Sequence, residues 1–187
     1  MAFLPWKGNL DPLLQAMRQS ETIVISGPCW INTYPARLFE LLEAAAASGG
    51  FGGQKLYGII NGGMPYIHAH IHGLKALSLF AKSCALEYRG GFVLGGGAML
   101  DGQPLERHLN RKTVVRAFDR FIEHVKEGSI SPDSLFEEAQ HPPGRLMTRV
   151  FAKILTIMTN WRIRKHGHNP HAPYNYSASG SVDNGKR

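Results

Sequence analysis

The residues best suited to hold a ligand form a short loop, Gly27-Pro28-Cys29-Trp30-Ile31-Asn32, that directly follows the apolar run 22–25. Trp30 offers an aromatic wall on which a flat ring can stack, and the Asn32 amide can donate and accept hydrogen bonds. The glycine keeps one position of the turn free of a side chain, so a ligand can approach the backbone closely. This combination favours a planar heteroaromatic ligand. Core packing of Trp30 and helix capping by Asn32 are the alternative roles.

Two further loops of the same kind follow later apolar runs. Asn61-Gly62-Gly63-Met64-Pro65 comes after 55–60, and Gly95-Gly96-Gly97-Ala98-Met99 comes after 88–94. Each loop by itself could be an ordinary strand-to-helix turn. Ligands of open α/β sheets bind at the carboxyl ends of the strands, where such loops meet. The three loops together therefore predict one shared crevice.

The elements that must position these loops alternate between strands and helices. Apolar runs predict strands over 22–25, 55–60 and 88–94. Apolar residues at helical spacing predict helices over 35–47, 66–86, 112–127 and 145–165, and a shorter helix is expected after residue 131. Another helix opens at Asp11, which can cap it, with Pro12 in its first turn. The alternation indicates an α/β fold with right-handed βαβ units and a parallel sheet.

The composition is that of a folded protein and not of a disordered one. Hydrophobic residues make up 43% of the 187 residues and charged residues 19%. The net charge is +7, and no acidic residue occurs between Gln140 and Val182, which permits an anionic partner. Nucleic acid is not the expected partner, because no motif for reading it is present. With two cysteines, no signal peptide and no span, the expected location is cytoplasmic.

Two weaker signals carry little chemistry. His68, His70 and His72 invite a metal interpretation, but only the first and third share a helix face and no third ligand is evident, so no metal site is predicted. Cys29 could be a redox thiol, although a small apolar filler is the favoured role.

The expected helix 145–165 has one broad apolar face, and Arg145, Arg149 and Lys153 line the opposite side. Packing on the sheet or in a dimer interface is the favoured interpretation, because an apolar stripe most often faces a core. Contact with a membrane surface or a partner subunit through 145–165 is the alternative. The expected organisation is a domain over 1–140, this helix within 141–167 and a flexible tail over 168–187.

With these loops in place, the chain resembles a known family. Pro28-Cys-Trp-Ile-Asn-Thr-Tyr-Pro-Ala36 looks like the flavin loop of the flavodoxin-like, NAD(P)H-dependent FMN reductases, which commonly read Ser-Pro-Val-Tyr-x-x-x-x-Pro-Ala there. The loops 61–65 and 95–99 resemble that family's next loop and the end of its last strand. The likeness runs from about residue 11 to 126, and more loosely through the final helix.

The resemblance implies a cofactor and a reaction. Pro28, Cys29, Trp30, Ile31 and Asn32 would flank the isoalloxazine ring and ribityl chain of FMN. Asn61, Gly62, Gly63 and Met64 would meet the other side of the ring. The implied activity is an FMN-dependent NAD(P)H oxidoreductase that passes electrons to a quinone, flavin or similar small acceptor, in a homo-oligomer such as a dimer. No side chain need act as a catalytic acid or base, because the flavin itself transfers the hydride.

The sequence departs from the family at two places. Gly27 stands where the family usually has Ser. More importantly, the family begins with a strand, a phosphate-binding loop and a second strand, and none of these precedes Thr22. The expectation is a flavodoxin-like sheet with helices on both faces, truncated at its N-terminus, with 22–25 as an open edge and no helix dipole for the FMN phosphate. The alternative function is a non-catalytic interaction module that binds a partner protein or a membrane surface through this edge and the basic helix.

Overall fold

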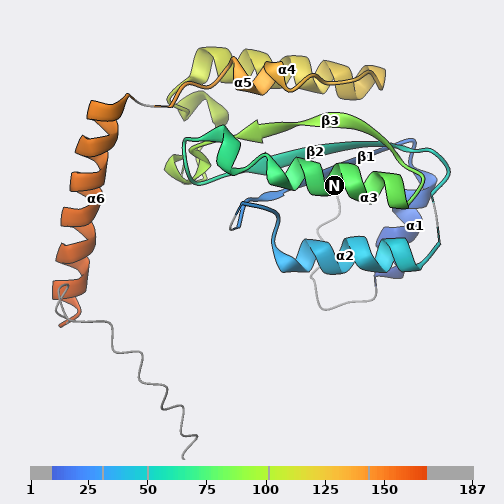
Figure 1. The fold of residues 1–187 in the computed structure, drawn as a ribbon, viewed down its shortest axis with the longest axis horizontal. Helices are drawn as coiled ribbons and strands as arrows, with labels where there is room; N and C mark the ends of the chain where they lie inside the picture. The colour runs from blue at the N-terminus through green and yellow to red at the C-terminus, as the bar shows by residue number, and fades with distance from the viewer. Residues whose placement is uncertain (1–9, 31, 50, 101, 143, 168–187) are drawn as a thin grey trace, which may run out of the picture. The chain divides into compact units, whose positions relative to one another are not determined.

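The computed structural model describes residues 10–30, 32–49, 51–100, 102–142 and 144–167 (Figure 1). The chain divides into two compact units, Met1–Pro142 and Pro143–Arg187. The expected tail over 168–187 lies outside the described residues. Each unit is considered by itself below.

The first unit alternates helices and strands as the sequence predicts. Its elements are α1 (Asp11–Gln19), β1 (Thr22–Pro28), α2 (Ala36–Ala47), β2 (Lys55–Asn61), α3 (His72–Ser83), β3 (Glu87–Leu94), α4 (Arg111–Glu127) and the short α5 (Ser134–Glu137). The described part of the second unit is essentially one helix, α6 (Arg145–Lys165).

The three strands form one parallel sheet in the order β1-β2-β3. This sheet with its helices fits the predicted α/β flavodoxin-like fold. Within the described residues β1 pairs only with β2 and is therefore an edge strand. Val24 of β1 is 44% exposed, while Ile23 and Ile25 on either side of it are buried. Thus β1 is buried on one face, although its apolar sequence predicts burial on both.

Helices cover both faces of the sheet (Figure 1). On one face α3 packs so closely that a Cβ at Gly58 of β2 would lie 2.6 Å from the Leu74 side chain. The Tyr34 ring is buried on the same face, and its hydroxyl donates a hydrogen bond to the Ile59 carbonyl at 3.0 Å. The space over Gly58 is therefore already filled by the Leu74 and Tyr34 side chains.

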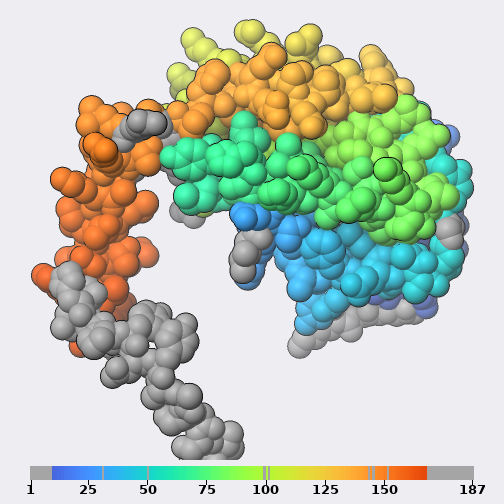
Figure 2. All heavy atoms as spheres, in the orientation of Figure 1, coloured from blue at the N-terminus to red at the C-terminus, as the bar shows by residue number. Residues whose placement is uncertain are grey.

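The opposite face is held by an aromatic cluster under α4 and α5. The Phe92 ring of β3 packs against Phe118 and Phe121 of α4 and Phe136 of α5, with centroids 5.2, 5.7 and 6.1 Å away. Phe92, Phe121 and Phe136 are almost completely buried. In Figure 2 the visible surface of this unit shows α2, α3 and the α4–α5 segment as successive bands from blue to orange.

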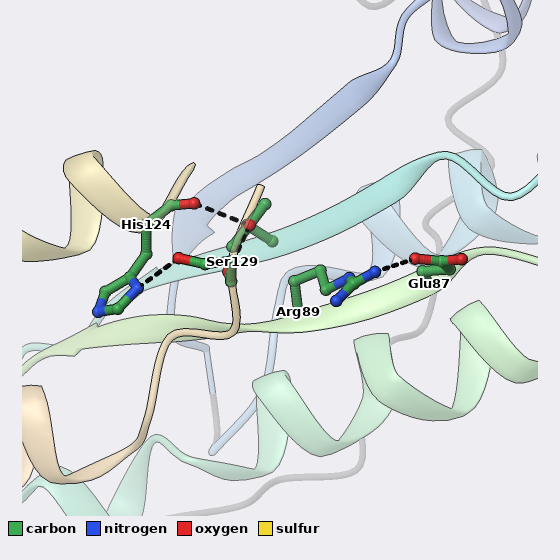
Figure 3. Close-up of polar contacts among 5 residues, drawn as sticks. Glu87, Arg89, His124 and Ser129 are labelled. Atoms are coloured by element: carbon green, nitrogen blue, oxygen red, sulfur yellow. Dashed lines mark hydrogen bonds and ion pairs between the residues drawn. The ribbon is translucent and has the colours of Figure 1, made fainter. Parts of the chain in front are cut away.

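The end of α4 is fastened to β2 by polar contacts (Figure 3). The Tyr57 hydroxyl lies 3.0 Å from the His124 carbonyl and 2.7 Å from the Ser129 carbonyl, and it has one proton to share between them. The His124 ring and the Ser129 hydroxyl point toward one another, with Nδ1 and Oγ 2.7 Å apart. Burial raises the pKa of Tyr57. Its hydroxyl therefore stays a donor at neutral pH.

Two local expectations are wrong. The helix expected from residue 66 begins only at His72, after a short 3₁₀ turn at Ile67–Ala69. Asp11 does not cap α1, because the N-cap position is Leu10 and no side chain caps it. Pro12 does stand in the first turn, where its missing N–H costs no hydrogen bond.

Candidate functional site

The three predicted loops meet at one edge of the sheet. Pro28, Asn61 and Leu94 are register partners at the carboxyl ends of β1, β2 and β3. Beyond the strands the loops stay bonded: the Cys29 N–H donates to the Asn61 carbonyl, and the Gly62 N–H donates to the Leu94 carbonyl, both at 2.7 Å. The predicted convergence of the three loops is therefore present.

The first loop is a tight turn that leaves Trp30 outside the core. The Trp30 N–H donates to the Thr33 carbonyl at 2.6 Å, and the Thr33 N–H donates back at 3.3 Å. Asn32 has a φ of 68°, a left-handed conformation that Asn tolerates better than most residues. Trp30 is 67% exposed, so it is not a core residue. Neither Asn32 nor Thr33 caps α2, whose N-cap is Pro35.

The second loop rests on a buried histidine. The His70 ring lies so close to Gly62 that a Cβ there would come within 2.1 Å of it. Its Nε2–H donates to the Met64 carbonyl at 2.9 Å, and His70 is only 4% exposed. The three histidines were expected to face solvent or to stand in a loop, and His70 stands in a turn but is buried, where its ring packs against the second loop. Met64 is 57% exposed.

The third loop closes against the second. The Gly96 N–H donates to the Met64 carbonyl at 2.7 Å, and the Gly97 N–H donates to the Gly62 carbonyl at 2.8 Å. The Asn61 side chain occupies the space where a Cβ of Gly97 would stand. Only glycine at position 97 allows this approach. The Asn61 side chain, at the start of the second loop, thus packs against the backbone of the third loop.

Two buried polar residues that sequence reasoning missed fix the start of the third loop. The Gly95 N–H donates to Gln140 Oε1 at 2.8 Å, and His108 Nε2 donates to the Gly95 carbonyl at 2.8 Å. The Gln140 amide also donates to the Val93 carbonyl at 2.7 Å. No local pattern marks either residue, since their partners lie 13 to 47 positions away.

A cavity of about 140 Å³ lies beside this third loop. Its lining residues are Pro65, Gly95, Gly96, Leu100, Arg107, His108, Leu109, Asn110, Gln140 and His141. None of the predicted binding residues lines it. The predicted site is instead an open surface, on which Pro28, Trp30, Asn32 and Met64 are exposed.

Cys29 has the properties of a filler and not of a reactive thiol. Burial raises the pKa of Cys29, and the backbone N–H of Asn32 offsets this only in part. A thiol with a raised pKa carries little of the nucleophilic thiolate at neutral pH. Within the described residues, no cluster of three or more His, Cys, Asp or Glu is placed to hold a metal.

Of the nine predicted residues, the structure connects Cys29, Asn61, Gly62 and Met64 through the hydrogen bonds of the three loops. Pro28 ends β1 directly before them. Gly63 stands between Gly62 and Met64 and is exposed. Ile31 lies outside the described residues. The result is a platform of loop backbone joined by hydrogen bonds, with two exposed apolar side chains, Trp30 and Met64.

The chain matches none of the protein-family models, curated proteins or solved structures with which it was compared. No helix in the described ranges is long and apolar enough to cross a lipid bilayer.

Proposed function

We propose that this protein is an FMN-dependent NAD(P)H oxidoreductase that passes electrons to a quinone, flavin or similar small acceptor. The observation that carries the proposal is the bonded platform of three loops at the carboxyl edge of the sheet. Such an edge is where open α/β sheets bind ligands. Exposed Trp30 and Met64 supply apolar contact area that the folded core does not use.

The residues present fit the ring half of a flavin. Trp30 offers a face for stacking, Met64 a polarizable side chain, and Asn32 and Asn61 polar groups for the ring edge. When bound, the flavin would supply two-electron chemistry by accepting a hydride. The protein's part is to hold the ring in one orientation and keep one face open to the donor.

The phosphate half of the cofactor finds no comparable contacts in these loops. Among the described residues α1 directly precedes β1, and no strand stands ahead of β1 to carry a counterpart of the family's phosphate-binding loop. A phosphate normally binds at the free N–H groups of a helix N-terminus, as in such a loop. We therefore expect FMN and riboflavin to bind with affinities within about threefold of each other, because the phosphate adds little.

The test is a fluorescence titration of the purified full-length chain with FMN and riboflavin, followed by an assay of NADPH oxidation. We expect saturable quenching of flavin emission and flavin-dependent NADPH consumption. Trp30→Ala should weaken binding on the order of tenfold, because base-like rings gain about 1–3 kcal/mol by stacking on an aromatic. Leu79→Ala is the matched control, since Leu79 is equally exposed (67%) but lies on α3. A chain that quenches no flavin would refute the proposal.

A second candidate, the non-catalytic interaction module, is favoured by the β1 edge. Among the described strands only β2 pairs with β1, and the strand carries the exposed apolar side chain of Val24. An open strand edge offers backbone groups for pairing with another chain. The assay of NADPH consumption separates the two candidates. A module of this kind, like the proposed homo-oligomer, would elute above monomer mass, but it would consume no NADPH.

A further inference from the structure

The net positive charge of this protein comes entirely from its second unit. Residues 1–142 contain 13 Lys and Arg and 13 Asp and Glu, so they are neutral. Residues 143–187 contain eight Lys and Arg and one Asp, which accounts for the whole net charge of +7. Attraction to an anionic partner would therefore act through the second unit.

Helix α6 has a wide apolar face. Helical periodicity places eight large apolar side chains on about half of its circumference. They are Leu146, Met147, Val150, Ile154, Leu155, Ile157, Met158 and Trp161, and each is between 44% and 78% exposed. Within its own unit no other described element covers this face.

The cations of α6 are arranged around that face. By helical periodicity Arg149 lies on the side opposite the apolar face and Lys153 at the margin of that face, and Arg162, Arg164 and Lys165 stand in the last turn. The Lys165 ammonium lies 5.2 Å from the centre of the Trp161 ring. The helix contains no acidic residue. Trp and long basic side chains suit the boundary between lipid headgroups and acyl chains, where the apolar part is buried and the polar end stays in water.

We propose that α6 binds the surface of an anionic lipid bilayer, with its apolar face at the acyl boundary and its cations at the headgroup phosphates. The helix lies in the plane of the surface, because its charge prevents it from spanning a bilayer. At 21 residues it is about 30 Å long. The proposal does not depend on flavin binding by the first unit.

The charge pattern favours an anionic bilayer over a second copy of α6 and over the first unit. Pairing of two copies of α6 would bring together two helices that carry cations and no anions, and like charges oppose this. The neutral first unit offers no net attraction for these cations. An anionic bilayer satisfies both features of the helix, since its headgroups are negative and its interior is apolar.

The test is co-sedimentation of the full-length chain with vesicles of phosphatidylcholine alone or mixed with phosphatidylglycerol. We expect binding to the mixed vesicles, weak binding to the neutral ones and loss of binding at high salt. Arg149→Gln combined with Lys153→Gln should lower the partition coefficient roughly 30-fold, since each cation near the surface contributes about fivefold.

Ile154→Gln on the apolar face should weaken vesicle binding on the order of tenfold. Thr156→Gln, two residues away on the polar side, is the matched control and should bind as the unmodified chain does. The proposal is overturned if mixed vesicles bind no protein or if neutral vesicles bind it equally well. It is also overturned if Ile154→Gln and Thr156→Gln bind the mixed vesicles with the same affinity. Oligomers that Ile154→Gln dissociates, without vesicle binding, would assign the face to a second copy.

Discussion

At the scale of single residues, the candidate site depends on side chains that lie beneath it. His70 fills the space next to Gly62 and holds the Met64 carbonyl. Its Nδ1 is buried without a hydrogen-bond partner among the described residues. The sequence has histidines at positions 68, 70 and 72, and this spacing does not predict which of them is buried. His70 is the one that turns inward, because its Nε2–H donates to the Met64 carbonyl of the second loop.

Gly62→Ala tests this packing. The added methyl would overlap the His70 ring, so we expect the free energy of unfolding to fall by about 1–3 kcal/mol, as overpacking usually costs. Gly63→Ala is the control in the same loop, because its Cβ would make only an ordinary contact, 3.4 Å from Ala98. Both variants are compared by urea denaturation. Equal stability of the two would show that His70 does not hold the loop as described.

At the scale of elements, the strands and most helices were predictable. The errors arose where a local structure depends on tertiary contacts, which a local pattern does not record. The strand and helix bounds follow apolar periodicity, which is local. Helix α3 starts later than predicted because residues 67–69 form a 3₁₀ turn that directs His70 toward the Met64 carbonyl. The attachment of α4 to β2 was likewise invisible, since Tyr57 and Ser129 are 72 positions apart.

Tyr57→Phe tests how α4 is attached. The variant removes the donor to the His124 and Ser129 carbonyls, and we expect it to cost about 1–2 kcal/mol of stability. Thermal unfolding measures the effect. Tyr66→Phe is the control, because Tyr66 directly follows the second loop and its described contact is a ring contact with His68, which the variant keeps. A variant as stable as the control would mean that water or other groups replace the hydroxyl.

At the scale of the whole molecule, the buried hydrophobic residues among those that the structure describes all belong to the first unit. Its buried hydrophobic residues run from Leu14 to Ala139. A chain that ends at Pro142 should therefore unfold with the same free energy as the full chain, within about 0.5 kcal/mol. The measurement is urea denaturation of both chains by circular dichroism. A clearly less stable short chain would indicate that α6 packs on the first unit, which the sequence favoured.

The sequence by itself determined the α/β alternation, the three glycine-bearing loops and the concentration of positive charge near the C-terminal end. These are local properties: periodicity, residue type and charge along the chain. Only the tertiary structure decided that Gln140, His108 and His70 would hold the loops, and that Trp30 would stand outside the core. Those outcomes depend on which backbone groups lack a partner after the strands have paired, and residues far apart in the chain supply that partner.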